Sequence, residues 1–322
     1  MDEKLELEEQ IRIAYKKLKA SAYFDKTLLP LRDRIVAFEG PDASTKLSDL
    51  YANLKSEDCK KWEIYKANIL NKIDVLVFPK KLMDWSEENQ IIFNTDCEPI
   101  QLEKAQYFID LPVEGHILGV LWILSVGLSL DDRNDPDNML MYEHSYGNRL
   151  RKTLVNPKSK NITYSPNLFE AYFSQYESWR DKALEYAKSR LDDKQDALIL
   201  TLDFRSFFYS VDITRDAFDE TLRYLKNIDE VKNPNSWYRR VHEFVYEVLV
   251  KYSEMIQTIS TDPELTIKHR TILPIGFLPS NILSNWALTP FDNAIVKRWN
   301  PVYYGRYVDD VIIVDKVEKT VH

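Results

Sequence analysis

The strongest constraint on the fold is residues 303–314, which read YYGRYVDDVIIV. Two runs rich in Val, Ile and Tyr flank Asp309 and Asp310, a pattern that predicts a β-hairpin with two carboxylates at its tip. Like charges held together at the rim of a sheet repel each other, and a divalent cation would relieve that repulsion. Adjacent acids also occur at 131–132 and 192–193, where the context predicts solvated loop. The strands on both sides are what favour a metal site here.

The size and composition of the chain are those of a globular protein. Its 322 residues are 44% hydrophobic, enough to bury a large core in two or more subdomains. Nothing reaches the roughly 18 uninterrupted apolar residues of a membrane span, and the charged N-terminus MDEKLELEEQ lacks the apolar centre of a signal peptide. We therefore expect a cytoplasmic protein without a membrane partner. Cys59 and Cys97 have no partner at ligand spacing and are interpreted as structural.

The formal net charge of −8 argues against a protein that holds nucleic acid by bulk positive charge. A local basic strip is present, however, because residues 149–190 contain nine Lys or Arg against four acids. The strip is compatible with phosphate contacts and equally with a solvated helix face. It begins just after Gly147, where a tight backbone bend is expected.

Helical periodicity predicts most of the remaining elements. The first forty residues and then 44–75 have apolar residues at helical spacing, with a break at Gly40-Pro41-Asp42. Short runs between Val75 and Phe93 favour strands, whereas Val113 to Leu128 fits either a strand pair or a buried helix. Two further helices are predicted, one opened by Ser165-Pro166 with an aromatic stripe interpreted as core, and one over 236–258.

A second acidic site is predicted at the end of a buried strand. Residues 197–204, ALILTLDF, form a short apolar run in which Asp203 closes the strand. Burying an aspartate there without a partner would be costly, so a ligand or capping role is expected. Phe208 follows five residues later, and Asp212 is interpreted as the N-cap of a short helix over 214–224.

A turn with one glycine lies between the two acidic sites. It contains Pro274-Ile275-Gly276 and is followed by Pro279, which suits the first turn of a helix. Free backbone N–H groups and small side chains are therefore expected at the edge of a cleft.

Residues from Asp203 through Gly276 to Asp310 resemble motifs A, B and C of the reverse transcriptase palm, in that order. The resemblance implies an α+β right-hand polymerase fold with fingers and an antiparallel palm sheet. It divides the chain into an N-terminal helical region (1–60), a fingers-like region (61–195) and an incomplete palm (196–322) with a helical insertion at about 214–262. Twelve residues follow Asp310, so we expect the thumb to be absent and a further C-terminal region or a partner subunit to complete the site.

The resemblance also assigns roles to individual residues. Asp203, Asp309 and Asp310 would bind two Mg²⁺ ions, or Mn²⁺, roughly 4 Å apart and catalyse phosphoryl transfer. Phe208 would lie under the sugar of the incoming nucleotide, and Gly276 would let the backbone approach the template and primer terminus. The segment that holds the triphosphate in intron enzymes has no clear counterpart, and its nearest substitutes are Arg149, Arg151 and Lys152.

Within the family, the chain looks most like the bacterial antiphage lineages, the abortive-infection and defence-associated reverse transcriptases. Those enzymes make DNA on a non-coding RNA template or without a template, sometimes primed by a protein hydroxyl. The implied partners are deoxynucleoside triphosphates, an RNA template and a DNA product, and a homo-oligomer is left open. Ile275 stands where retroviral and intron enzymes usually carry glutamine, which puts ordinary template handling in question.

Three other functions are alternatives to a reverse transcriptase. A palm polymerase that uses ribonucleotides would share the acids, but the bulky Phe208 disfavours it. A catalytically silent palm that acts as a scaffold would share the fold, and the expected absence of a thumb favours it. A small-molecule nucleotide-binding protein would need a glycine-rich phosphate loop, and neither GxxxxGK nor GxGxxG occurs in the sequence.

Overall fold

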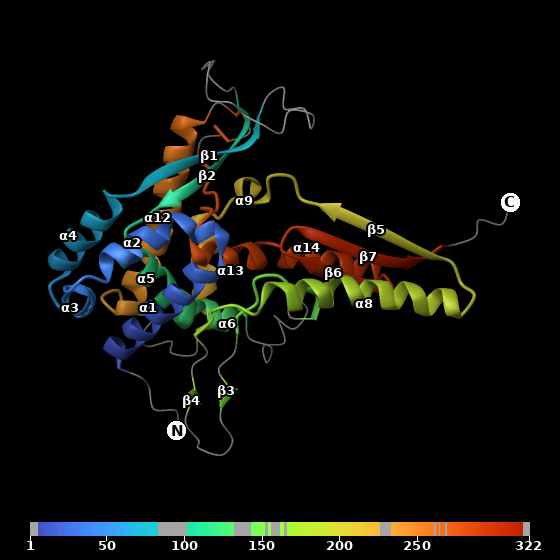
Figure 1. Cartoon of the computed structure of the whole chain (residues 1–322), viewed down its shortest axis with the longest axis horizontal. Helices are drawn as coiled ribbons and strands as arrows, with labels where there is room; N and C mark the ends of the chain where they lie inside the picture. Colours follow the sequence, from blue (N-terminus) through green and yellow to red (C-terminus); the bar gives the residue numbers. More distant parts are fainter. Residues whose placement is uncertain are drawn as a thin grey trace.

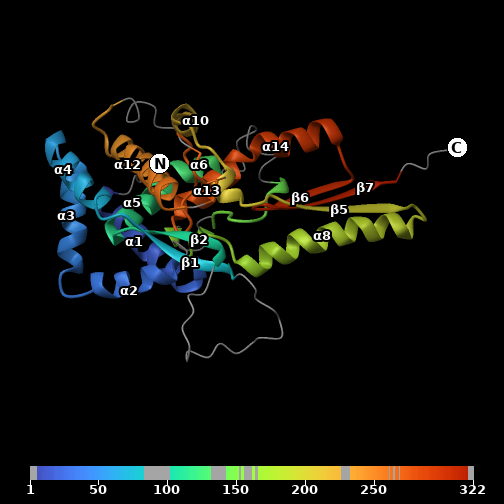
Figure 2. The same ribbon diagram turned by 90° about the horizontal axis from the view of Figure 1, so that it is seen from above.

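The computed structural model is a mixed α+β protein rich in helices (Figure 1). The α+β class predicted from the sequence is therefore confirmed. Helices and a two-stranded hairpin fill one half of the molecule, and a three-stranded sheet with its covering helices fills the other (Figures 1 and 2). The structure describes residues 6–82, 102–131, 143–151, 154–155, 162–163, 166–225, 233–260, 262–263, 265–267 and 269–317.

The N-terminal part of the chain is helical, as the periodicity predicted. Its apolar residues lie on one face of each helix, so that Leu18, Leu50 and Leu54 are fully buried in a shared core. Cys59, interpreted from the sequence as structural, is exposed at the start of the last of these helices. The elements are α1 (Leu7–Phe24), the 3-10 turn η1 (Lys26–Leu28), α2 (Leu29–Phe38), α3 (Ala43–Lys55) and α4 (Cys59–Leu70).

An antiparallel hairpin of β1 (Asp74–Leu82) and β2 (Leu102–Asp110) follows. The hairpin confirms the strand predicted from Val75, and the part of that prediction beyond residue 82 lies outside the described residues. The backbone N–H of Ile109 donates to the carbonyl of Ile275 at 2.9 Å, which ties β2 to the glycine turn far along the chain.

The apolar stretch from Val113 is helical, which settles the choice between a strand pair and a helix. It consists of α5 (Val113–Trp122), the π-helical turn η2 (Ile123–Gly127) and α6 (Leu128–Leu130). This continuous helix is long and apolar enough to cross a membrane, and it is the only one of that kind in the part of the chain described here. Because 72% of it is buried inside the protein, its apolar character is accounted for by the core.

The helix predicted over 236–258 is present as α12 (Trp237–Ile259) and packs against α5. Its His242 is fully enclosed, because Phe218 stacks on the imidazole with ring centroids 4.2 Å apart. The indole N–H of Trp122 lies 3.2 Å from Nδ1, and Nε2 lies 3.0 Å from an Asp219 carboxylate oxygen. A neutral ring that accepts at Nδ1 and donates from Nε2 satisfies both contacts.

Acid should destabilise the protein through His242. Burial lowers its pKa to about 4, although Asp219 opposes the shift. A base whose folded pKa is depressed stabilises the fold above its ordinary pKa of about 6.5 and loses that contribution as the pH falls, here by about 3 kcal/mol near pH 4. Chemical denaturation between pH 7 and pH 4 should show a flatter stability curve for His242→Gln than for the wild type. The exposed His269, changed to Asn, is the control and should leave the curve unchanged.

The C-terminal half is built on a three-stranded antiparallel sheet. Its strands are β5 (Ala197–Asp203), β6 (Tyr303–Tyr307) and β7 (Asp310–Lys316), in the order β5-β7-β6, so the predicted hairpin is present as β6–β7. α8 (Tyr172–Asp192) covers one face. α14 (Thr289–Ala294) and the π-helical turn η4 (Ile295–Trp299) cover the other, and Figure 2 shows the sheet between these two layers.

β5 is covered much less than its neighbours. In the described part of the chain it pairs only with β7, and its outer edge has no partner strand. Leu198 and Ile199, which point to opposite faces, are 48% and 47% exposed, and Leu202 is 43% exposed. The continuous apolar run that predicted a fully buried strand therefore lies at a free edge.

α8 begins at Tyr172, later than predicted. Pro166 precedes the helix by six residues, and Phe169 instead forms an isolated bridge with Leu150. The aromatic stripe is core only in part, because Trp179 is buried whereas Tyr172 is 60% exposed and the next residue, Phe173, is 70% exposed. The prediction failed because the stripe is longer than the sheet surface available to cover it.

The remaining elements connect the two halves. Asp212 does not cap the short helix as predicted: Thr214 accepts from the N–H of Ala217, while Asp212 accepts from the N–H of Thr271 at 2.9 Å. The predicted helix is otherwise present. The elements are β3 (Leu154–Val155), β4 (Ile162–Thr163), α9 (Phe207–Ser210), α10 (Arg215–Glu220), the 3-10 turn η3 (Thr221–Tyr224) and α13 (Leu278–Ala287).

Candidate active site

Three acids meet at one end of the C-terminal sheet. Asp203 ends β5 and lies directly opposite Asp310, the first residue of β7. Asp309 lies in the turn just before it, and its carbonyl accepts from the N–H of Phe204 at 3.3 Å. Cross-strand partners project from the same face, so Asp203 and Asp310 share the face that α8 covers farther along. We call Asp203, Asp309 and Asp310 the carboxylate edge.

The carboxylate edge is electrostatically strained. Burial raises the pKa of Asp309 above its ordinary value, and the charges of Asp310 and Asp203 raise it further. Burial also raises the pKa of Asp310, again with help from the charge of Asp203. Lys80 of β1 acts in the opposite direction on Asp309, which places its ammonium group within electrostatic reach of that carboxylate. A cation bound among the three acids would relieve the same strain.

The donor set at the carboxylate edge suits a hard divalent cation. Carboxylate oxygens are the ligands that Mg²⁺ prefers, and the pairing of Asp203 with Asp310, next to Asp309 in the turn, brings these acids to one end of the sheet. Within the described residues, no group of three or more His, Cys, Asp or Glu side chains is gathered tightly enough to hold a metal ion. The chemistry of the residues therefore fits Mg²⁺ or Mn²⁺, and binding would require the carboxylates to turn toward one another.

The turn that carries Asp309 has a strained backbone. Val308 has a φ of 57°, a region that a β-branched residue enters at a cost on the order of 1–3 kcal/mol. Two neighbours hold it there. The Arg306 guanidinium donates from Nη1 to the Val308 carbonyl at 2.7 Å, and Gly147 packs directly against the Val308 backbone.

A methyl group at Gly147 should disturb this turn. A Cβ there would lie 2.6 Å from Cγ2 of Val308 and 2.8 Å from its backbone nitrogen, and the backbone nitrogen cannot move without the turn. We expect Gly147→Ala to lower the free energy of unfolding by about 1–3 kcal/mol. Gly40→Ala is the control, because the nearest atom to its Cβ would be 3.9 Å away. Equal stability of the two variants in urea denaturation would contradict the close packing.

The predicted glycine turn lies against the β1–β2 hairpin. Gly276 has a φ of +90°, which side chains rarely adopt, and the carbonyl of its neighbour Ile275 is the one bonded to Ile109 of β2. α13 starts immediately afterwards, with a proline in its first turn as predicted. Phe208 is half-buried nearby, and its carbonyl accepts from the N–H of Leu273 at 3.0 Å.

The three cations predicted to hold the triphosphate are placed differently from one another. Arg149 is 6% exposed and lies 2.6 Å from an Asp131 carboxylate oxygen, so its guanidinium is engaged in a buried ion pair. That placement does not support a phosphate contact. Arg151 is half-buried, and Lys152 lies outside the described residues. A cation whose charge does act on the carboxylate edge is Lys80, which lowers the pKa of Asp309 and which no sequence motif indicated.

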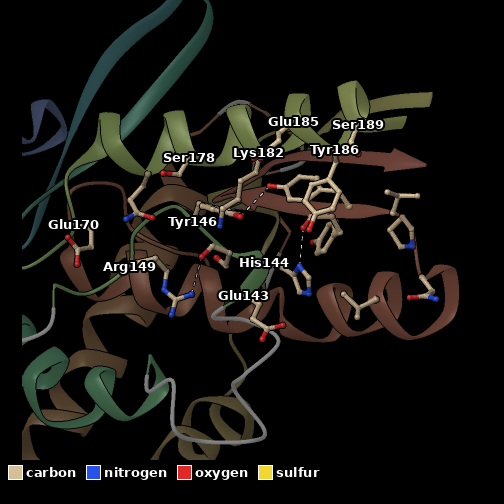
Figure 3. Close-up of a pocket in the computed structure, with 18 of the residues that line it drawn as sticks. Glu143, His144, Tyr146, Arg149, Glu170, Ser178, Lys182, Glu185, Tyr186 and Ser189 are labelled. Carbon is tan, nitrogen blue, oxygen red and sulfur yellow. Dashed lines mark hydrogen bonds between the residues drawn. The ribbon is translucent and has the colours of Figure 1, made fainter. Parts of the chain in front are cut away.

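A cavity of about 940 Å³ lies away from the carboxylate edge, between α8, the outer edge of β6 and residues 143–150 (Figure 3). Its lining includes Lys182 and Tyr186 of α8 and the ring of His144, whose Nδ1 is 3.0 Å from the Tyr304 carbonyl. None of the three acids lines it. This cavity and the carboxylate edge therefore lie at different places.

Arg306 and Asn285 are the site residues that sequence reasoning missed. Both are buried beside the carboxylate edge, at 0% and 2% exposure. A signal was present for Arg306, because an arginine within a strand of otherwise apolar and aromatic residues must find a buried partner. Asn285 gave no comparable signal.

Comparisons with known proteins add no relative: no model of a protein family matches the sequence, and no curated protein matches it. The function is therefore inferred from the motifs of the chain and from their arrangement in space.

Proposed function

We propose that the chain is a nucleotidyltransferase of the reverse transcriptase type. It would make DNA from deoxynucleoside triphosphates, on an RNA template or without one, in bacterial antiphage defence. The observation that carries the proposal is the direct pairing of Asp203 with Asp310, with Asp309 in the adjoining turn. Supporting it is the order of motifs around Asp203, Gly276 and Asp310, which resembles that of the reverse transcriptase palm. The antiphage role rests on that resemblance alone.

The carboxylate edge would hold the catalytic cations. Bound Mg²⁺ would lower the pKa of an attacking hydroxyl and neutralise the charge of a triphosphate. Asp203 is exposed at the end of its strand and can receive a ligand directly, whereas Asp309 and Asp310 are half-buried and fixed by the hairpin. The backbone thus supplies one accessible carboxylate and two constrained ones.

Lys80 is the residue best placed to meet the triphosphate. It lies on β1, and its charge lowers the pKa of Asp309, so its ammonium group is within electrostatic reach of the carboxylate edge. An ammonium group is a compact donor for phosphate oxygens. This assignment takes the place of Arg149, whose guanidinium is engaged with Asp131.

The second candidate function is a catalytically silent palm that acts as a scaffold subunit. It is favoured by the spacing of the three acids, since among the described residues no group of acidic side chains is gathered tightly enough to hold a metal. Such a subunit would have the same fold but no catalytic activity. A scaffold and an enzyme differ in one measurable respect, which is metal-dependent use of nucleotides.

The deciding experiment is incorporation of labelled deoxynucleotides by the purified 322-residue chain. It is run with Mg²⁺ or Mn²⁺, with and without a primed RNA template, and with EDTA as the blank. Label that enters DNA only when a divalent cation is present supports the enzyme. Purified chain that incorporates nothing and does not bind Mn²⁺ in electron paramagnetic resonance titrations would favour the scaffold.

A further inference from the structure

Arg306 lies at the centre of a buried polar network next to the carboxylate edge. Its side chain is fully buried within β6. Nε and Nη2 donate to the two carboxylate oxygens of Asp292, each at 2.8 Å, which is a bidentate ion pair. The Tyr304 hydroxyl also donates to Asp292. Nη1 makes the remaining contacts, with Asn285 Oδ1 at 3.0 Å and with the Val308 carbonyl at 2.7 Å.

The same network reaches the other side of the Val308 turn. Asn285 donates from Nδ2 to the Gly147 carbonyl at 2.8 Å and accepts from the Ser145 hydroxyl at 3.1 Å. The Tyr146 N–H donates to the Arg306 carbonyl at 2.8 Å. Residues 145–147 are thereby fixed to β6, and Gly147 is pressed against Val308. The turn is held from both sides by groups that converge on one guanidinium.

Stability alone does not explain this arrangement. A buried ion pair is often replaceable by apolar residues of similar volume without loss of stability, because desolvation offsets the attraction between the charges. The contact that an apolar replacement cannot reproduce is the bond to the Val308 carbonyl. That bond acts on the one residue of the turn with a left-handed backbone, immediately before Asp309.

We infer that Arg306 is a positioning residue for the carboxylate edge. By donating to the Val308 carbonyl it holds the turn in the conformation that sets Asp309, and Asp292 and Asn285 fix the guanidinium in turn. This inference rests on the proposed function for its chemical meaning. The ordering of the turn by Arg306 does not depend on that function, so the positioning role and the proposed function can be tested separately.

The test uses an apolar triple variant, Arg306→Met with Asp292→Leu and Tyr304→Phe, which removes the ion pair together with the hydroxyl that donates to Asp292. Removing Arg306 alone would leave a buried charge and could unfold the protein, which is why the partners are changed together. Amide hydrogen exchange in residues 307–310 reports the order of the turn. Titration with Mn²⁺ alone, followed by electron paramagnetic resonance, reports the site.

We expect the triple variant to fold, to exchange the amides of 307–310 at least about ten-fold faster and to bind Mn²⁺ about 10–100-fold more weakly, as groups behind metal ligands do. Asn285→Ala leaves the ion pair in place and should move both readouts in the same direction by less. It also decides the question should the triple variant fail to fold.

Arg240→Met is the matched control. Arg240 is also a buried arginine that donates to backbone carbonyls, those of Leu54 at 3.0 Å and Ser56 at 2.7 Å, but it lies in α12. Its loss should lower stability without changing either readout at the turn. Unchanged exchange of 307–310 in the folded triple variant and in Asn285→Ala would overturn the positioning role. Wild-type protein that shows no Mn²⁺ binding would overturn the proposed function instead, whatever the exchange data show.

Discussion

Asp309→Asn is expected to abolish nucleotide incorporation and, at the same time, to stabilise the metal-free protein. The loss of activity should be on the order of 10³-fold or more, because in the proposed function the variant removes a charged ligand from the site where the cations would act. Asp203→Asn should cost as much activity. The gain in stability has a separate cause, which is the burial of the Asp309 carboxylate together with its repulsion by Asp310 and Asp203.

The sign of the stability change follows from the raised pKa of Asp309. Burial and the charges of Asp310 and Asp203 make its carboxyl hold a proton more tightly in the folded chain than in the unfolded one. Between the ordinary pKa of about 4 and the raised pKa of the folded chain, the folded state holds more protons than the unfolded state, so stability falls as the pH rises through that range. Asparagine has no proton to lose. The variant should therefore have the higher Tm at neutral pH without metal, and adding Mg²⁺ should narrow the difference.

Asp315→Asn is the control for these variants, because Asp315 lies on β7, the strand that follows Asp309, but at the end far from the three acids, where it accepts from the indole N–H of Trp299. It should keep wild-type incorporation. Measurements of incorporation and of thermal unfolding with and without Mg²⁺ complete the test. Near-wild-type incorporation by Asp309→Asn would show that the metal assignment is wrong.

Phe208→Ala is expected to admit ribonucleotides. In the proposed function its ring lies beneath the sugar, where it leaves a 2′-hydroxyl neither room nor a hydrogen-bond partner. A penalty of about 2–3 kcal/mol corresponds to roughly 100-fold discrimination, which the variant should lose. Because the ring is only half-buried, the stability cost should stay below the roughly 3–5 kcal/mol of a fully buried phenylalanine.

Phe207→Ala is the matched control for sugar choice. Phe207 is 5% exposed and packs edge-on against Phe208, with ring centroids 5.8 Å apart. Its loss should cost the larger amount of stability and leave the preference for deoxynucleotides unchanged. Competition between the two nucleotide types, measured beside thermal unfolding, separates the variants. Unchanged discrimination in a still-active Phe208→Ala protein would place Phe208 in the core alone.

The sequence predicted the elements whose signals are local. The β6–β7 hairpin, β5, α12 and the proline-opened α13 all follow from alternation, apolar runs or helical spacing within a few residues. The predicted start of α8 was wrong, because the residue at which a helix begins depends on where the surface of the sheet that it covers ends. The prediction that Asp212 caps a helix was wrong for a related reason. Its hydrogen-bond partner, the N–H of Thr271, lies far along the chain.

The acids of the candidate site could be predicted from the sequence, but the residues that surround them could not. Asp203 and Asp310 end and begin apolar strands, a pattern visible in one dimension. That the charge of Lys80 acts on Asp309, or that Arg149 pairs with Asp131, depends on how distant segments fold together. Spacing along the chain carries no information on such pairings. A basic residue close to a motif in the sequence, such as Arg149, was therefore a poor guide to the basic residue that acts on the acids in the folded chain.

The free edge of β5 also affects how the molecule behaves at high concentration. An uncovered strand with apolar side chains on both faces is a template for strands of other molecules, so association should grow with concentration. Colloidal stability and yield would then be limited by this edge rather than by the free energy of folding. Leu198 offers the simplest remedy, since it projects from the face opposite Asp203 and a lysine there would keep the molecule monodisperse without touching the acids.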